Sequence, residues 1–256
     1  NPDTPQMALL KPDGPGPFPA LVLLHQCGGL RPVNAVRLNW SMLGWAKEAV
    51  SRGYVALLLD SLGPRAVDSV CFGARNGVNL QRGVRDALQG LAHLQKLPYV
   101  DAKNVYFAGF SWGAMIGLLS SSASWSEALG EGRHFRSVAV LYPGCFDIHP
   151  ANGPSFPLVN RDIDTPVLAL LGELDTETPA SDCLSRFEPL KAAGRPIEWH
   201  LYAGTTHCWD CETLDGLRKT DLRGASVEYR YSRENTRDAV EGVFGFFSRI
   251  QGASSP

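Results

Sequence analysis

The sequence around Ser111 decides the fold: residues 105–115 read VYFAGFSWGAM. The first five of these residues are mostly apolar and predict a short buried strand, and residues 114–119 predict a helix. Between them, Gly109 and Gly113 flank Ser111 in a Gly-x-Ser-x-Gly pattern. Small residues are needed there because strand and helix nearly touch in a sharp strand-to-helix turn. The pattern predicts a serine hydroxyl that stands clear of a sheet, and a plain Gly- and Ser-rich turn is the alternative.

A second glycine-containing turn follows an earlier apolar run, residues 20–25. The run predicts a strand buried on both faces, and Gln26, Cys27 and two glycines come directly after it. We expect the backbone N–H of Cys27 to oppose that of Trp112, which lies at a helix N-terminus, so that both could stabilise an oxyanion. A tight turn without this role is the alternative. His25, beside the turn, is expected to shape the site.

Apolar runs and amphipathic segments alternate along nearly the whole chain. This alternation predicts an α/β fold with a mostly parallel central sheet and helices on both faces, in one domain over residues 1–256. A loop over 61–77 and irregular stretches over 120–136 and 143–165 separate some of these elements, and 208–231 is an insertion that the sequence leaves open as a lid, a dimer surface or a pocket wall. The expected strands are 7–10, 20–25, 54–59, 105–109, 137–142, 166–171 and 197–202, and the expected helices are 39–52, 79–96, 114–119, 180–193 and 232–250.

Ser111, Asp175 and His207 each come just after a predicted strand. The carboxyl ends of parallel strands share one edge of a sheet, so we expect the three side chains to meet there. The chain order Ser, Asp, His is the order found in α/β-hydrolases. We expect His207 to take the proton of Ser111 and return it to a leaving group, while Asp175 orients the imidazole.

Other acids and histidines fit this pattern less well. Asp162 and Asp164 precede a strand instead of following one, and Glu173 is the first replacement for Asp175 if that residue is not the acid. His200 lies inside a strand and His93 on a helix. The remaining histidines, His134 and His149, lie in polar or Pro-rich stretches.

Composition excludes several classes of protein. The chain is 44% hydrophobic and 20% charged, which is ordinary for a globular protein. A net charge of −2 gives no reason to expect nucleic acid or a membrane surface as partner. No apolar run approaches the ~20 residues needed to span a bilayer. No signal peptide is visible, and because the chain begins with Asn1 rather than Met, that absence is uninformative.

The six cysteines allow three pairings, each with members in or beside predicted loops. Disulfides would suit an exported protein, and six reduced thiols in a cytoplasmic protein are the alternative. Cys208-x-x-Cys211 follows His207, but no second such pair completes a zinc site, so neither a metal nor an organic cofactor is expected. The three pairings are Cys27 with Cys71, Cys145 with Cys183, and Cys208 with Cys211.

These motifs together resemble a dienelactone hydrolase-like member of the α/β-hydrolase superfamily, and the resemblance covers roughly residues 20–250. It rests on five segments: HQCGGL at 25–30, DSLGPR at 60–65, GFSWG at 109–113, GELD at 172–175 with Thr178-Pro179, and Thr206-His207. The resemblance implies the hydrolase fold and the triad. It also implies a disulfide between Cys145 and Cys183, because Ser-containing relatives carry cysteines at similar positions and are often exported.

Two differences from the family's namesake enzymes affect the expected substrate. Those enzymes carry a cysteine nucleophile where this chain has Ser111, and a glutamate where it has Gln26. Both differences argue against dienelactone. They favour a serine hydrolase that cleaves a carboxylic ester or an amide through an acyl-enzyme.

Substrate contacts are less well defined by the sequence. Gln26 at the oxyanion turn, and Arg65 and Arg75 in the loop after residue 60, are candidate substrate-binding residues. If the arginines face the pocket, an anionic small molecule or an anionic polymer becomes an attractive substrate; a solvated loop or structural pairing with acids is the alternative. A non-catalytic binding protein and an acyltransferase with the same triad are the alternative functions. A homodimer is possible, and the expected compartment is periplasmic or secreted, with cytoplasmic as the alternative.

Overall fold

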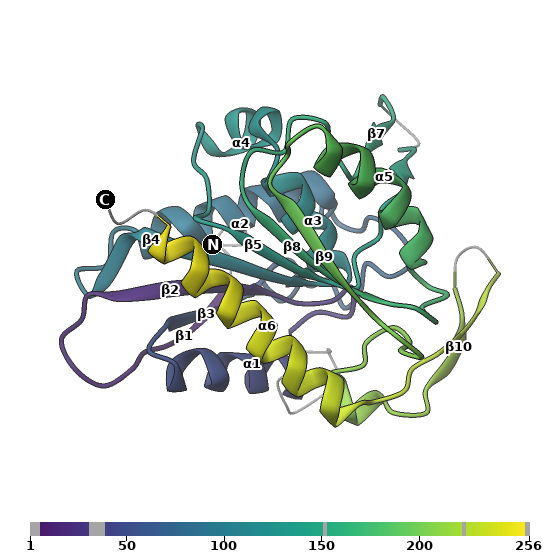
Figure 1. Ribbon diagram of the computed structural model, residues 1–256, viewed down its shortest axis with the longest axis horizontal. Coiled ribbons are helices and arrows are strands. Elements are labelled where there is room, and N and C mark those ends of the chain that lie inside the picture. The colour runs from purple at the N-terminus through teal and green to yellow at the C-terminus, as the bar shows by residue number, and fades with distance from the viewer. Residues whose placement is uncertain (1–5, 31–38, 151–152, 222–223, 254–256) are drawn as a thin grey trace.

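The computed structural model describes residues 6–30, 39–150, 153–221 and 224–253. These residues form one central sheet of seven strands (Figure 1). Only the edge strand β1 is antiparallel to its neighbour, and all other neighbouring pairs in this sheet are parallel. The strands lie in the spatial order β1 (Gln6–Leu10), β3 (Val55–Asp60), β2 (Phe18–Leu24), β4 (Val100–Phe110), β5 (Val138–Leu141), β8 (Val167–Gly172) and β9 (Ile197–Tyr202).

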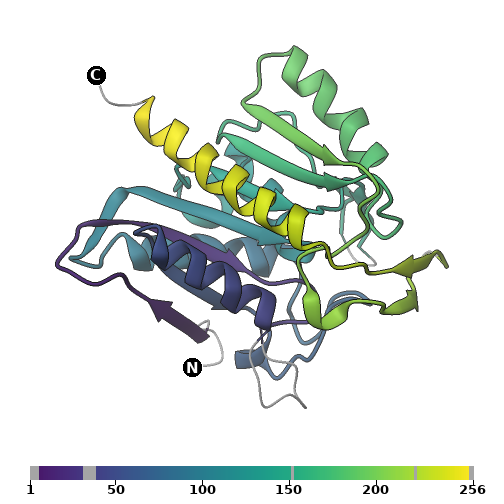
Figure 2. The same ribbon diagram turned by 60° about the horizontal axis from the view of Figure 1, so that its bottom comes forward.

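Helices cover both faces of this sheet, as expected from the sequence. On one face lie α1 (Trp40–Ser51) and α6 (Arg233–Gly252), which both cross in front of the strands in Figure 2. The other face carries α2 (Leu80–Leu94), α3 (Trp112–Ser120) and α5 (Ala180–Ala192), with α4 (Ala123–Gly130) packed against α2. The mostly parallel α/β architecture is therefore confirmed.

The central strands are buried on both faces because each contributes to two hydrophobic clusters. In β2, Val22 and Leu24 belong to the cluster under α2, α3 and α5. Leu21 and Leu23 point the other way, into the cluster under α1 and α6. A strand that must be apolar on both faces reads as a continuous apolar run, which is why the sequence predicts β2 well.

Four connections contain structure that the sequence pattern did not predict. The stretch 120–136 holds α4, whose Trp125 and Leu129 pack partly buried against the core. The stretch 143–165 holds a short antiparallel pair, β6 (Asp147–Ile148) with β7 (Phe156–Pro157). The insertion 208–231 holds a second antiparallel pair, β10 (Arg218–Thr220) with β11 (Ser226–Glu228), and two 3₁₀ turns lie at Gly63–Arg65 and Glu212–Leu214. Such pieces are too short for a periodic signal.

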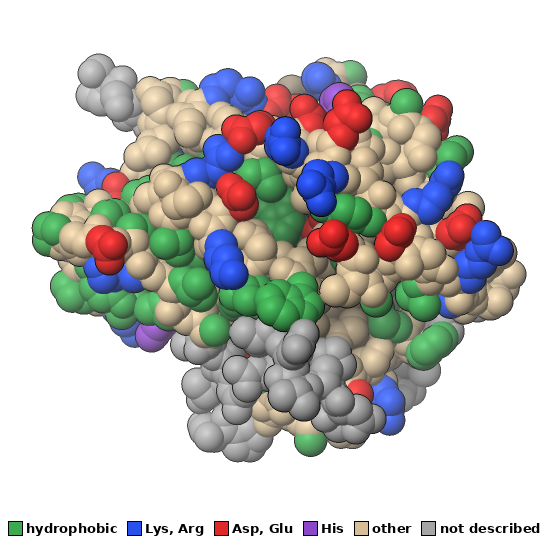
Figure 3. Space-filling view, turned by 90° about the horizontal axis from the view of Figure 1, so that it is seen from below, with side chains coloured by type: hydrophobic (Ala, Val, Ile, Leu, Met, Phe, Trp, Pro, Cys, Tyr) green, Lys and Arg blue, Asp and Glu red, His purple; other side chains and the backbone are tan. Residues whose placement is uncertain are grey.

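The surface agrees with the balanced composition. On the face shown in Figure 3, Lys and Arg side chains lie among Asp and Glu side chains. Within the described residues, no helix combines the length and apolarity needed to cross a bilayer.

Candidate active site

Three loops bring Ser111, Asp175 and His207 together at the carboxyl edge of the sheet. Ser111 follows β4, Asp175 follows β8 and His207 follows β9. The Ser111 Oγ lies 3.0 Å from His207 Nε2, and His207 Nδ1 lies 2.7 Å from Asp175 Oδ2. All three residues are buried. The structure therefore assembles a hydroxyl, an imidazole and a carboxylate into one hydrogen-bonded chain.

Ser111 sits in a strained turn between β4 and α3. Its φ of 51° and ψ of −109° are unusual for a residue with a side chain. The turn is tight: a Cβ on Gly109 would lie 2.2 Å from the Gly113 carbonyl oxygen, and one on Gly113 would lie 2.3 Å from the Leu24 carbonyl oxygen. Glycine is thus required on both sides of the serine, as the sequence pattern predicts.

The loop after β8 fixes the carboxylate of Asp175. Its Oδ1 accepts the N–H groups of Glu177 at 2.9 Å and Thr178 at 2.8 Å. Its Oδ2 accepts the Thr178 hydroxyl at 2.8 Å, beside its contact with His207. A carboxylate partner requires the proton of the neutral imidazole on Nδ1, so Nε2 is left as the acceptor that faces Ser111.

The pKa of His207 reflects opposing effects. Burial alone lowers it, but the charge and hydrogen bond of Asp175 and the nearby charge of Glu177 raise the pKa above its usual value. An imidazole with a raised pKa accepts a proton readily, which suits a general base.

Glu173, the alternative acid, is occupied elsewhere. Its Oε2 accepts the backbone N–H of Gly204 at 2.8 Å. The geometry therefore favours Asp175 as the partner of His207.

The turn after β2 is held by His25. The Nδ1 of His25 donates to the Gln26 carbonyl oxygen at 2.6 Å, so its Nε2 accepts the Ser61 N–H at 3.2 Å. Its ring stacks on Trp112, with centroids 5.7 Å apart. Burial lowers the pKa of His25, although the charge of Asp60 opposes this effect. His25 thus shapes the turn that contains Cys27, as expected.

The backbone N–H groups of Cys27 and Trp112 are the candidate oxyanion donors. Trp112 is the first residue of α3, where N–H groups have no partner within the helix. Among the described residues, neither N–H has a hydrogen-bond acceptor.

Gln26 is engaged by the protein at both ends of its side-chain amide. Its Oε1 accepts Asn39 Nδ2 at 2.8 Å, and its Nε2 donates to the Tyr142 hydroxyl at 3.3 Å. The Tyr142 hydroxyl in turn donates to Asp210 Oδ1 at 2.7 Å. Gln26 links the turn after β2 to a polar cluster behind His207.

The two candidate arginines lie in different environments. Arg65 is almost buried and forms a two-pronged ion pair with Asp86, at 2.8 and 2.9 Å. It also donates to the Ser61 carbonyl oxygen. Arg65 therefore fits the alternative in which the arginine pairs with an acid for structural reasons. Arg75 is exposed and pairs through its backbone with Val78.

All three expected disulfides are present: Cys27–Cys71, Cys145–Cys183 and Cys208–Cys211. The first ties the turn after β2 to the loop after β3. The third closes the turn that follows His207. Asp210 lies near Cys208 and Cys211, but disulfide sulfurs lack the thiolate charge that binds metals, so this cluster does not fit a metal site as it stands.

Three residues beside His207 were not identified from the sequence. Glu177 Oε2 lies 3.8 Å from His207 Nε2. Lys219 and Tyr229, which belong to the insertion, both contact this carboxylate. Glu177 lies two residues after Asp175, so its closeness to the site could have been predicted from the sequence. Nothing in the sequence shows where a hairpin from an insertion will pack.

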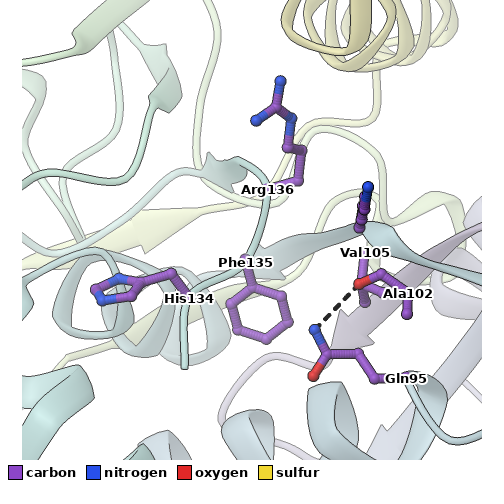
Figure 4. A pocket seen from close by; sticks show the side chains of 7 residues that line it. Gln95, Ala102, Val105, His134, Phe135 and Arg136 are labelled. Carbon is purple, nitrogen blue, oxygen red and sulfur yellow. Dashed lines mark hydrogen bonds between the residues drawn. The ribbon is translucent and has the colours of Figure 1, made fainter. Parts of the chain in front are cut away.

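A separate hollow of about 480 Å³ lies at the opposite edge of the sheet. It is lined by residues at the start of β4 and before β5, and Gln95 donates to the Ala102 carbonyl oxygen across it (Figure 4). It contains none of the three residues of the hydrogen-bonded chain.

Comparisons with known proteins agree with this arrangement. The chain matches the model of the dienelactone hydrolase family over residues 6–251. A Klebsiella pneumoniae structure assigned to a dienelactone hydrolase superimposes with a TM-score of 0.69 at 16% identity, covering 95% of this chain and 92% of the other. A thermophilic esterase from Thermogutta terrifontis, with propionate bound, gives a TM-score of 0.66 at 14% identity and coverages of 95% and 89%. These likenesses show the α/β-hydrolase fold.

A curated relative is much longer than this chain. Dipeptidyl-peptidase 5 of Porphyromonas gingivalis is 23% identical over 231 residues, which are 78% of this chain and 32% of that protein. The chain thus spans about a third of the length of this relative. The family match covers nearly all of the described residues, and the chain belongs to the dienelactone hydrolase family.

Proposed function

We propose that this chain is a serine hydrolase that cleaves a carboxylic ester or amide through an acyl-enzyme. The observation that carries the proposal is the hydrogen-bonded chain from Asp175 through His207 to Ser111, with distances of 2.7 and 3.0 Å. A serine hydroxyl is a weak nucleophile at neutral pH and needs an adjacent base, which this arrangement supplies.

In the proposed reaction, Ser111 Oγ attacks the substrate carbonyl carbon while His207 Nε2 takes the hydroxyl proton. Asp175 stabilises the imidazolium that results. The N–H groups of Cys27 and Trp112 bind the negative oxygen of the tetrahedral intermediate, an effect worth about 3–4 kcal/mol for each donor. His207 then protonates the leaving group, and water releases the acyl group by the same steps.

The comparisons support small acyl esters as the first substrates to test. The Thermogutta terrifontis esterase has been solved with propionate, with butyrate, and phosphorylated by paraoxon. The dipeptidyl-peptidase relative keeps amides in the panel. Arg65 is paired with Asp86. Of the two candidate arginines, Arg75 is therefore the one proposed to contact an anionic or polymeric substrate.

The three disulfides support a periplasmic or secreted location, since such bonds persist in oxidising compartments. We therefore propose export, and assay under non-reducing conditions keeps these bonds intact.

The experiment compares wild type with Ser111→Ala on p-nitrophenyl acetate, p-nitrophenyl butyrate, a neutral peptide and an acidic peptide. We expect ester turnover in the wild type and a loss of about 10⁴-fold or more in Ser111→Ala. An unchanged rate in the variant would exclude Ser111 as nucleophile. An alcohol acceptor added to the same assay reveals acyl transfer as a transesterified product.

A further inference from the structure

The β10–β11 hairpin brings two polar side chains to the carboxylate of Glu177. Lys219 Nζ, on β10, lies 2.8 Å from Glu177 Oε1. The Tyr229 hydroxyl, one residue after β11, donates to Glu177 Oε2 at 2.7 Å. Lys219 also lies over the Tyr229 ring, 5.0 Å from its centroid. Each carboxylate oxygen of Glu177 is therefore held by a side chain of the insertion.

The same carboxylate faces the reactive nitrogen of His207. Glu177 Oε2 lies 3.8 Å from His207 Nε2, the nitrogen that also contacts Ser111 Oγ. The ring of Tyr229 covers His207 at 5.5 Å between centroids. The imidazole thus lies between two acids: Asp175 at Nδ1 and Glu177 near Nε2.

The hairpin is fixed to both loops that carry the candidate catalytic groups. Thr176 Oγ1 donates to the Ser226 carbonyl oxygen at 2.9 Å, which ties β11 to the loop of Asp175. The Arg230 N–H donates to Thr206 Oγ1 at 2.9 Å, which ties the end of the hairpin to the loop of His207. These contacts hold the hairpin against the candidate site.

We propose that Glu177 is a positioning residue that places a negative charge beside His207 Nε2. Lys219 and Tyr229 of the β10–β11 hairpin hold this carboxylate in position, and the charge of Lys219 limits its effect on His207. This inference rests on the proposed serine hydrolase function and adds to it. A carboxylate near Nε2 stabilises the imidazolium that forms when Ser111 loses its proton, and the ammonium of Lys219 opposes that effect.

The groups around His207 give these two residues opposite effects. Tyr142 and Tyr229 stay neutral as His207 titrates, because burial raises the pKa of each phenol. Among the residues that the structure describes, the charges that remain are Asp175, Glu177 and Lys219, of which the two acids raise the pKa of His207 and the lysine lowers it. Within the described part of the chain, the titratable and charged groups that face His207 are Asp175 and Glu177 after β8, Tyr142 after β5, Lys219 on β10 and Tyr229 after β11.

The test is the pH dependence of kcat/KM for p-nitrophenyl butyrate in Glu177→Gln, Lys219→Met and the double variant. The acid limb reports the protonation of His207. We expect its midpoint to fall by about 0.5–1 pH unit in Glu177→Gln and to rise in Lys219→Met. In the double variant, which has lost both charges, the midpoint is expected to lie between those of the two single variants.

A matched control comes from the same hairpin. Arg218 and Glu228 form an exposed ion pair across β10 and β11, at 2.9 Å. Glu228→Gln and Arg218→Met are expected to leave the midpoint within about 0.2 pH unit of wild type, because screened surface charges have little effect at a distance. Unchanged midpoints in Glu177→Gln and Lys219→Met, or shifts of equal sign, would overturn the inference.

A second readout separates this inference from the proposed function. In Ser111→Ala protein with ¹⁵N-labelled histidine, the ring nitrogens of His207 can be titrated by NMR without any turnover, and His207→Gln identifies their signals. The same opposite shifts are expected there. If Ser111→Ala keeps full esterase activity but the NMR shifts appear, the proposed function fails and the charge effect stands; if turnover needs Ser111 and no shift appears, only the inference fails.

Discussion

At the scale of single residues, the candidate site combines a serine with a strained backbone and a histidine of raised proton affinity. Ser111 holds a positive φ of 51°, which the tight glycine contacts on either side impose. The pKa of His207 is lowered by burial but raised overall by its acidic neighbours. The surrounding fold thus stabilises a strained backbone at Ser111 and a shifted pKa at His207, and both features are typical of functional sites.

The raised pKa of His207 predicts the acid limb of activity. His207 must be neutral to take the serine proton, so kcat/KM for ester hydrolysis is expected to fall as pH drops through a midpoint above 6.5, the usual histidine value. In Asp175→Asn the rate at pH 7 is expected to drop about 10⁴-fold, because the tautomer of His207 is no longer fixed. A pH–rate profile from pH 5 to 9 checks both expectations; a rate that is flat down to pH 5 would contradict them.

Arg65 gives a residue-scale prediction about stability. Arg65→Met removes the partner of Asp86, whose side chain is fully buried, and is expected to cost about 3–5 kcal/mol of unfolding free energy at pH 7. Burial already raises the pKa of Asp86, with Arg65 opposing that effect. Without Arg65 the folded-state pKa rises further above the unfolded value, so the variant loses stability as pH rises through that folded-state pKa.

Urea unfolding of wild type and Arg65→Met at pH 5 and pH 7 measures this. The difference in stability between the two proteins should be larger at pH 7. If instead Arg65→Met unfolds like wild type but binds anionic esters less well than neutral ones, Arg65 contacts substrate and the structural role is wrong.

At the scale of elements, α2 packs closely against α3, the helix that begins after Ser111. A Cβ on Gly83 of α2 would lie 2.1 Å from Ile116 Cδ1 of α3. Gly83→Ala is therefore expected to cost about 1–3 kcal/mol through overpacking. Gly44 is exposed on α1, and no atom of a described residue lies within 4 Å of a Cβ placed there, so Gly44→Ala is expected to stabilise by about 0.5–1 kcal/mol through helix propensity.

Thermal unfolding of the two alanine variants tests this packing. The melting temperature should fall for Gly83→Ala and rise for Gly44→Ala. A rise in both would mean that the α2–α3 contact can relax without cost.

Elements were predictable where a pattern was long or continuous. The apolar runs gave β2, β3, β5 and β8 nearly to their ends, because strands buried on both faces must be apolar throughout. The strand β4 begins at Val100, earlier than expected, since Asp101, Lys103 and Asn104 interrupt its apolar pattern. Helix α4 and the β10–β11 hairpin are short and stabilised by what they pack on, so no local signal marks them.

At the scale of the whole molecule, disulfides tie down the long connections between elements of the sheet. Cys145–Cys183 joins residues 38 apart, whereas Cys208–Cys211 joins residues 3 apart. Since a larger closed loop restricts the unfolded chain more, the pair Cys145→Ala/Cys183→Ala is expected to lose about 2–4 kcal/mol and Cys208→Ala/Cys211→Ala less. Urea midpoints of both variants measure the difference, and equal losses would contradict this ranking.

The candidate site was predictable in part. Chain order and strand ends predicted the meeting of Ser111, Asp175 and His207, because parallel strands deliver their carboxyl ends to one edge. The role of the arginine loop was left open by the sequence, since burial of Arg65 depends on its pairing with Asp86 in α2, which no local pattern shows. Glu177, Lys219 and Tyr229 meet only through tertiary packing of the insertion.

The most direct test of the proposed function is covalent labelling with an active-serine phosphonate, read by mass spectrometry of the intact protein and of its peptides. We predict one adduct per chain, located on Ser111, formed rapidly in wild type and much more slowly in His207→Gln. No adduct on Ser111 in wild type, or equal labelling in His207→Gln, would contradict an activated serine nucleophile and leave the fold without the proposed hydrolase function.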